Sequence, residues 1–184
     1  MSRTFVEIKA CYCRGNSFKM AGMATSHAAE LQVGQLAPPF ALKDQAGNIH
    51  RLSDYAGKWL VVYFYPRDDT PGCTREACRF RDDIARLQEL GVALLGISLD
   101  GAESHRRFAD KFKLPFPLLA DDGGSVARTY NAYRSLLFLR LARRHSFIID
   151  PTGHIARIYR KVDPNVHSAE VIADIQQLQR CYSR

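Results

Sequence analysis

The chain has 184 residues, of which 46% are hydrophobic, and it carries a formal net charge of +7. This length and apolar content suffice for one domain with a buried core, and no apolar run reaches the roughly 20 residues of a membrane span. The basic residues are scattered, and no nucleic-acid-binding motif accompanies them. We therefore expect a solvated basic surface, with neither a nucleic acid nor a membrane as partner.

Five cysteines make an odd count in a chain too large to need disulfide staples. This favours a reducing compartment, here the cytoplasm, and catalytic rather than structural thiols. Cys11 and Cys13 form a Cys-x-Cys pair without a nearby histidine, which is only a weak zinc signal, so we expect no metal and no cofactor. Cys181, near the end of the chain, has no assigned role.

Residues 1–30 show no sustained periodicity, and they lack the apolar core and cleavage site of a secretory signal. We interpret them as a mobile N-terminal extension that precedes a single domain over residues 31–184. A transit peptide is an alternative because the segment is basic and contains serines, although no clear amphipathic helix supports it. Met20 or Met23 could replace Met1 as the true start.

The first elements of the domain precede its cysteine-containing motif. Residues 37–43 and 48–52 predict two short strands around a glycine turn, which together form an N-terminal β-hairpin. Ser53 is expected to cap a short turn that ends at Gly57. The run 59–65 is continuously apolar and aromatic, which is typical of a strand covered on both faces.

A helix is expected soon after this strand. Thr70 is typical of a helix N-cap, and Pro71 fits the first helical position, where a missing N–H costs nothing. The helix is expected to run to about Leu90 and to end at Gly91. Cys73 then lies in the first turn, among unpaired backbone N–H groups at the positive end of the helix dipole, where a thiol readily becomes a thiolate.

The remaining elements alternate between strands and helices. Residues 92–99 predict a second buried strand, parallel to the first because a helix connects the two. Residues 103–112 predict a helix, and residues 115–120 predict a short strand whose prolines suit a sheet edge. Residues 125–130 predict a further short helix.

The C-terminal part predicts an antiparallel hairpin followed by a closing helix. The hairpin strands are residues 146–150 and 155–162, joined by a turn at 151–153. The helix is expected over residues 168–180. Its inner face would carry three apolar residues, Val171, Ile175 and Leu178.

Helix geometry places Cys73 toward the sheet. At about 100° per residue, four apolar residues fall within about 40° of it: Ala77, Phe80, Ile84 and Leu87. Cys78 lies about 140° round the helix, and the two cysteine Cα atoms are roughly 8.6 Å apart, beyond the reach of about 7 Å of a disulfide. If these two cysteines pair, the first turn must unwind.

This motif resembles the active-site signature of peroxiredoxins in the run Pro66-x-x-x-Thr70-x-x-Cys73. It is also similar to the Q-type subfamily, the bacterioferritin comigratory proteins, in the extension Thr70-Pro71-Gly72-Cys73-Thr74-x-x-x-Cys78. The similarity covers about residues 33–178. It implies a thiol-dependent peroxidase that reduces hydrogen peroxide and organic hydroperoxides in antioxidant defence. The order of elements suits the thioredoxin-like α/β fold, a central mixed sheet flanked by helices.

The resemblance also implies roles for individual residues. Cys73 would be the peroxidatic cysteine, which becomes a sulfenic acid, and Cys78 the resolving cysteine, which forms an intramolecular disulfide with it. The Thr70 hydroxyl would hydrogen-bond the peroxide or the thiolate, and Pro66 would shield the sulfur from water. Thioredoxin or a similar dithiol would reduce the disulfide. A monomer is compatible with this cycle because the resolving cysteine lies on the same helix.

A fixed cation completes the expected site. Family members carry an arginine two residues before a Ser/Thr-Phe pair on a late strand, and the run Arg-His-Ser-Phe that begins at Arg144 matches this pattern. Strand alternation places Arg144, Ser146 and Ile148 on one face, so we expect Arg144 to stabilise the thiolate and to position the peroxide. Arg143 is the alternative if the register is shifted by one residue.

One segment departs from the family pattern. The segment 130–142 contains the apolar run Leu136–Leu139, where many relatives carry a more polar loop with glycine. We interpret it as a helix that lines the pocket or as an interface. His145 is expected to be a packed or surface residue, because an ionised thiol needs no general base.

Three alternative functions stay open. A thiol–disulfide oxidoreductase of the thioredoxin type needs Cys-x-x-Cys at the helix start, but Thr70 occupies the first position of that motif, and no proline precedes Ser146, where thioredoxins place a cis-proline. A chaperone or binding module could use the same fold. A glutathione-dependent peroxidase differs in its reductant, which the sequence does not reveal.

Overall fold

The central strand of the fold is β3 (Trp59–Phe64), whose six residues are all buried. In this computed structural model, which describes residues 30–136 and 139–182, β3 runs parallel to β4 (Val92–Ser98) and antiparallel to β8 (Ser146–Ile149). The prediction of a buried strand is therefore confirmed. The expected N-terminal extension, with Cys11 and Cys13, lies outside the described residues except for Glu30.

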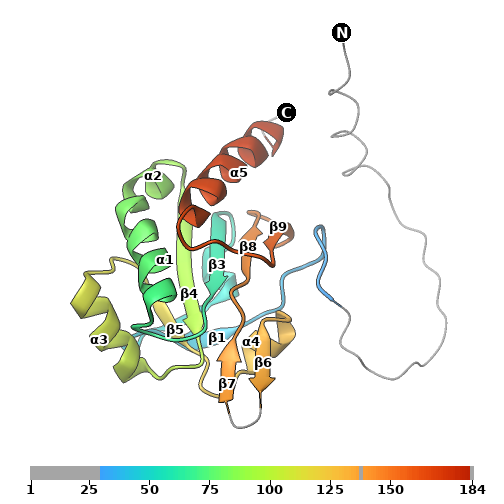
Figure 1. Cartoon of the computed structure of the whole chain (residues 1–184). Helices are drawn as coiled ribbons and strands as arrows, with labels where there is room; N and C mark the ends of the chain where they lie inside the picture. Colours follow the sequence, from blue (N-terminus) through green and yellow to red (C-terminus); the bar gives the residue numbers. More distant parts are fainter. Residues whose placement is uncertain (1–29, 137–138, 183–184) are drawn as a thin grey trace, which may run out of the picture.

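One mixed sheet contains seven strands in the order β2–β1–β5–β4–β3–β8–β9 (Figure 1). The strands not yet given are β1 (Ala41–Lys43), β2 (Ile49–Arg51), β5 (Leu118–Ala120) and β9 (Ile155–Tyr159). Strands β3, β4 and β5 are parallel, whereas the other pairs are antiparallel. The N-terminal and C-terminal hairpins are confirmed, with shorter strands than predicted.

Helices cover both faces of the sheet (Figure 1), because alternate side chains of β3 enter two separate clusters. The cluster on one face includes residues of four helices: α1 (Pro71–Asp82), α2 (Ile84–Glu89), α3 (Ala102–Phe112) and α5 (His167–Tyr182). The other cluster includes α4 (Ser125–Thr129) and residues 37–40. The predicted mixed α/β architecture is confirmed.

The helix after β3 is interrupted, whereas we predicted a continuous helix to about Leu90. Asp83 has a ψ of 4° and separates α1 from α2. Its carboxylate accepts a hydrogen bond of 2.6 Å from the Ser168 hydroxyl at the start of α5. A tertiary contact therefore accompanies the break in the helix. The second helix, α2, ends at Glu89, shortly before Gly91, whose φ is +68°.

Strand β5 lies inside the sheet, so the predicted edge position is wrong. It pairs with β4 on one side and, through Ala120, with β1 on the other. The Gln45 side chain pairs with the backbone just before the strand, since it accepts from Leu118 N at 2.8 Å and donates to Phe116 O at 3.2 Å. Next to Pro115 and Pro117, the Gln45 side chain thus supplies the hydrogen bonds that a neighbouring strand would otherwise make.

Residues 133–136 and 139–142 form strands, so the predicted helix in this segment is wrong, while the alternative of an interface stays a prediction. Strands β6 (Tyr133–Leu136) and β7 (Leu139–Ala142) pair antiparallel in a separate two-stranded sheet. The short turn predicted after Ser53 is a 3-10 helix, η1 (Leu52–Tyr55), and its N-cap is Arg51 rather than Ser53. Within the described residues, no helix is long and apolar enough to cross a membrane.

We predict that the buried His167 makes the fold sensitive to acid. The imidazole is 0% exposed, and its Nε2 lies 2.8 Å from the Ser146 hydroxyl. Burial, with the nearby Arg144 charge, lowers the pKa of His167 from 6.5 to about 4. Because the unfolded chain takes up this proton first, the free energy of unfolding should fall by up to about 3 kcal/mol as the pH falls from about 6.5 to about 4.

Chemical denaturation across this pH range measures the slope. A His167→Gln variant is expected to have a shallower slope than the parent, because its neutral amide cannot gain a proton. Equal slopes for variant and parent would assign the acid sensitivity to other groups.

Candidate active site

Cys73 lies in the first turn of α1, close to the end of β3. Thr70 is the N-cap with extended backbone (φ −93°, ψ 149°), and Pro71 is the first helical residue, as predicted. The first hydrogen bond of the helix runs from Thr74 N to Thr70 O at 2.8 Å. The Cys73 side chain is only 2% exposed and packs in the cluster between α1 and the sheet. The thiol therefore lies at the dipole-positive end of a helix and is largely shielded from water.

Arg144 is the cation at this thiol. Its Nη2 donates to Cys73 Sγ at 3.3 Å, and the segment is fixed by a hydrogen bond of 2.7 Å from Phe64 N to His145 O. Arg144 precedes β8 by two residues, and Ile148 of that strand packs in the same cluster as Cys73. Arg143 is exposed and lines a surface pocket together with Arg144.

A buried carboxylate, which the sequence reasoning missed, orients this arginine. Glu76 is 1% exposed, and its Oε2 accepts from Arg144 Nη1, while its Oε1 has no hydrogen-bond partner within the described parts of the chain. Burial raises the pKa of Glu76 to about 7 despite the opposing charge of Arg144. The available signal was its spacing, because a residue three positions after Cys73 lies on nearly the same helix face.

Gly72 leaves room for the guanidinium. A Cβ at this position would lie 3.1 Å from Arg144 Nη2, which is closer than most Cβ atoms approach a neighbour. A glycine next to the cysteine thus permits the arginine to pass over the first turn of α1.

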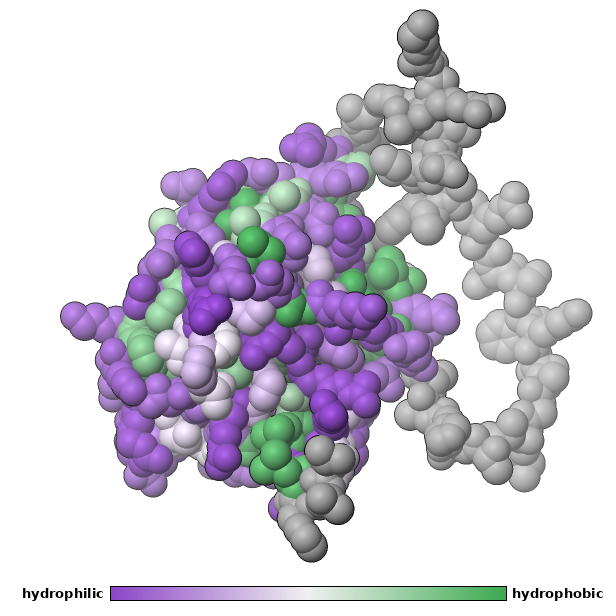
Figure 2. Space-filling model, in the orientation of Figure 1, coloured by the Kyte–Doolittle hydropathy of each residue, from purple (hydrophilic) through white to green (hydrophobic). Residues whose placement is uncertain are grey.

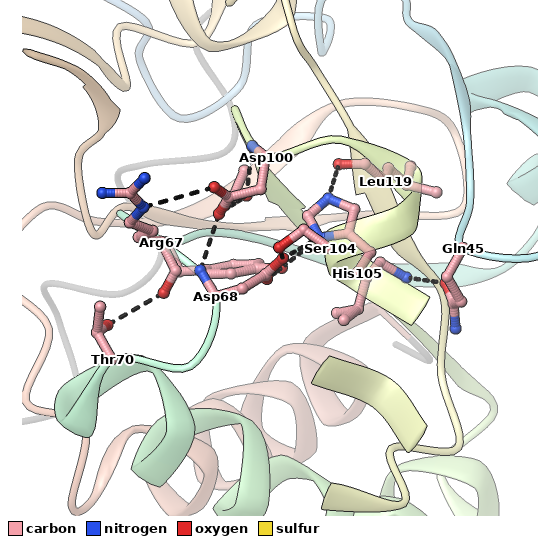
Figure 3. A network of polar contacts seen from close by, with 11 residues as sticks. Gln45, Arg67, Asp68, Thr70, Asp100, Ser104, His105 and Leu119 are labelled. Carbon is pink, nitrogen blue, oxygen red and sulfur yellow. Dashed lines mark hydrogen bonds and ion pairs between the residues drawn. The ribbon is translucent and has the colours of Figure 1, made fainter. Parts of the chain in front are cut away.

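Polar contacts position the loop between β3 and α1 (Figure 3). The Thr70 hydroxyl donates to Arg67 O at 3.0 Å rather than to the helix backbone. Asp68 N donates to Asp100 Oδ2 at 2.8 Å, which connects the loop to the end of β4. The buried Asp68 carboxylate accepts from Tyr65 OH and from the Ser104 hydroxyl, at 2.8 and 2.7 Å.

His105 of α3 completes this network. Its Nδ1 lies 2.8 Å from Asp68 Oδ2, and its Nε2 lies 3.2 Å from Leu119 O (Figure 3). The ring thus bridges the Asp68 carboxylate and the backbone of β5. Burial would raise the pKa of Asp68, but the hydrogen bonds and charge of His105 hold it below its usual value. The loop before α1 therefore rests on a buried contact between a carboxylate and an imidazole.

The structure does not bring the second cysteine of the motif to the first. Cys73 and Cys78 are both free thiols on one intact helix, and Cys78 is half-buried. Cys181 is exposed on α5, and Pro66 is half-buried after β3. No group of three or more metal-ligating side chains occurs among residues 30–136 and 139–182. The arrangement provides a shielded thiol, a fixed cation and a second thiol that requires a conformational change.

Comparisons with known sequences agree with this chemistry. Residues 33–158 match the AhpC/TSA family. The chain is 42% identical over 151 residues to the chloroplastic peroxiredoxin Q of Sedum lineare, which covers 82% of this chain and 81% of that protein. It is 40% identical over 151 residues to the chloroplastic peroxiredoxin Q of Populus jackii, which covers 82% of this chain and 70% of that protein.

Solved structures show the same fold. Peroxidoxin BcpB from Mycobacterium tuberculosis has a TM-score of 0.76 and 31% identity, and the match covers 80% of this chain and 98% of that one. Peroxiredoxin Q from Xanthomonas campestris has a TM-score of 0.71 and 31% identity, and the match covers 75% and 90%. The chain therefore belongs to the peroxiredoxins of the AhpC/TSA family, in the Q or bcp group, and is a thiol-dependent peroxidase.

Proposed function

We propose that Cys73 is the peroxidatic cysteine and that Arg144 is the cation which activates it. The observation that carries this proposal is the 3.3 Å contact between Arg144 Nη2 and Cys73 Sγ at the start of α1. A guanidinium is charged at every working pH, so it favours the thiolate over the thiol. The same group can donate to the peroxide that replaces water beside the sulfur.

The proposed reaction begins with attack of the Cys73 thiolate on one peroxide oxygen. The S–O bond forms as the O–O bond breaks, sulfur is oxidised to a sulfenic acid, and the leaving alkoxide or hydroxide takes a proton from water. Because the Thr70 hydroxyl donates to Arg67 O, its lone pairs remain available to accept from the peroxide O–H. Pro66, half-buried beside this loop, limits the approach of water in our proposal.

Glu76 acts as a positioning residue in this proposal. Its carboxylate binds Nη1 of Arg144, which leaves Nη2 directed at the sulfur. A free arginine side chain would sample many rotamers, whereas one with a buried partner does not. Glu76 therefore supports the thiolate without touching the peroxide.

Cys78 is the proposed resolving cysteine. Its sulfur attacks the sulfenic sulfur of Cys73, the S–S bond forms as the S–O bond breaks, and the hydroxyl leaves as water with the proton of the Cys78 thiol. The separation of about 8.6 Å in an intact helix requires the first turn of α1 to unwind first. The contacts of Asp68 lie upstream of this turn, so the loop before it can stay in place while residues 70–78 rearrange.

A dithiol then reduces the bond by exchange, and thioredoxin is our proposed donor. We propose that the protein works as a monomer in a reducing compartment, the cytoplasm, although the plant relatives are named chloroplastic. A thioredoxin-type oxidoreductase is disfavoured by Thr70, which stands where Cys-x-x-Cys would need a thiol, and by His145, which stands where the cis-proline would lie. Cys181 has no role in this cycle.

We expect one equivalent of peroxide to join Cys73 to Cys78 in the reduced protein. Trypsin cleaves after Arg75, so the disulfide would appear in mass spectrometry as two linked peptides. Cys73→Ser should abolish peroxide turnover, and Cys78→Ser should turn over once and then accumulate oxidised Cys73.

Three outcomes would count against these assignments. Equal steady-state rates for Cys78→Ser and the parent would exclude Cys78 as the resolving residue. A bond from Cys73 to another cysteine would do the same, and a Cys73→Ser variant with full activity would favour the binding-module alternative.

We expect Arg144→Ala to suppress thiolate formation, because it removes the charge beside the sulfur. The rate of Cys73 alkylation by iodoacetamide across pH should then rise only at higher pH than in the parent. The matched control is Arg143→Ala, which removes the adjacent charge and should leave this profile nearly unchanged. If Arg143→Ala shifted the alkylation profile and Arg144→Ala did not, Arg143 would be the activating cation.

We expect Gly72→Ala to reduce activity without destabilising the fold. The new methyl group would push Arg144 Nη2 away from its present position, so peroxide reduction should slow several-fold. Alanine favours a helix over glycine by up to about 1 kcal/mol, so the free energy of unfolding should stay constant or rise. Unchanged peroxide kinetics would show that the arginine tolerates displacement.

A further inference from the structure

A basic pocket lies beside Arg144 on the surface of the protein. We define it by its lining residues, Arg134, Arg143, Arg144, His145, Arg160, Lys161 and Val162. They come from β6, from the segment between β7 and β8, and from the segment after β9. Hydrophilic residues cover the face between the β6–β7 hairpin and the segment after β9 (Figure 2).

The basic pocket has more positive charge than its acidic neighbours can neutralise. Five cationic side chains line it, and no carboxylate does. Glu76 pairs with Arg144, and Glu30 pairs with Arg160 at 3.0 Å. The other three cations, Arg134, Arg143 and Lys161, form no ion pair with any of residues 30–136 or 139–182. Such a cluster attracts anions.

Two buried nitrogen atoms in the wall of the basic pocket also lack partners. His145 is 6% exposed, and its Nδ1 has no hydrogen-bond partner in the described chain; the same holds for Arg160 Nη1. Burial and the charges of Arg160 and Arg143 lower the pKa of His145 to about 4, so its ring is neutral near neutral pH. Buried polar atoms without partners are rare in folded proteins, so these two residues are the least satisfied polar side chains of the pocket lining.

The basic pocket and the reactive thiol share one side chain. Arg144 lines the pocket and also places its Nη2 3.3 Å from Cys73 Sγ. An anionic group in the pocket would therefore lie beside the same arginine that contacts the sulfur. A small organic molecule can span the separation between the pocket and the sulfur.

We propose that the basic pocket binds the anionic group of an organic hydroperoxide whose peroxide group reacts at Cys73. The ligand class is a hydroperoxide that carries a carboxylate a few bonds from the O–O group. The inference rests on the proposed role of Cys73 and adds a substrate class to it. Arg134, Arg143 and Lys161 serve as specificity-determining residues, because they attract the carboxylate and take no part in O–O cleavage.

The test compares two hydroperoxides that differ only in one carboxylate, cumene hydroperoxide and its para-carboxylate derivative. Stopped-flow measurement of Cys73 oxidation in the reduced, full-length protein isolates this step from recycling. We expect the carboxylate compound to react about tenfold faster at low salt, and this preference should decline as salt increases. The rate for cumene hydroperoxide should depend little on salt.

Variants then locate the effect. Arg134→Gln and Lys161→Gln should each lower the preference for the carboxylate compound about three- to fivefold, as expected for loss of one nearby charge. Their rates with cumene hydroperoxide and hydrogen peroxide should match the parent. Arg106→Gln, an exposed position on α3, is the control with the same loss of charge, and it should change neither rate.

The outcomes separate this inference from the proposed function. If both cumene compounds react equally fast, or if Arg106→Gln lowers the preference as much as Lys161→Gln, the carboxylate site is refuted while Cys73 remains the peroxidatic residue. A defect confined to reduction by thioredoxin would also refute it, since the pocket would then bind the reductant. If no hydroperoxide oxidises Cys73, the proposed function itself fails.

Discussion

The Arg144 guanidinium, shared between a buried carboxylate and a buried thiol, is the interaction on which the rest of the site depends. Its two terminal nitrogens face Glu76 Oε2 and Cys73 Sγ. Removing a carboxylate from water costs several kcal/mol. Arg144 offsets only part of this cost, so burial still raises the pKa of Glu76 to about 7. Gly72 supplies the space in which this arrangement fits.

The loop before α1 is held by more side-chain contacts than the first turn of α1. The loop before α1 rests on the buried contact between Asp68 and His105, and Asp68 N also contacts Asp100. The first turn of α1 has fewer such supports, since the Thr70 side chain does not cap the helix. In the proposed cycle this difference matters, because the turn must unwind while the loop keeps its place.

In our proposals the charges around Arg144 connect reactivity with substrate choice. The arginine contacts the thiol and a carboxylate, and it also lines the basic pocket together with the other cations. The same side chain can thus stabilise a thiolate and present a positive surface to an incoming anion. The β6–β7 hairpin, which carries Arg134, is the segment that departs from the expected family pattern.

The sequence by itself determined the elements whose cause is local. Apolar runs predicted the buried strands, the Thr70-Pro71 pair predicted the start of α1, and the spacing before Ser146 favoured Arg144 while leaving Arg143 open. Tertiary structure decided what depends on distant partners: the break at Asp83 opposite Ser168, the interior position of β5, and the pairing of Glu76 with Arg144. These contacts join residues far apart in the chain, and neither hydrophobic periodicity nor local propensity predicts which distant residues will meet.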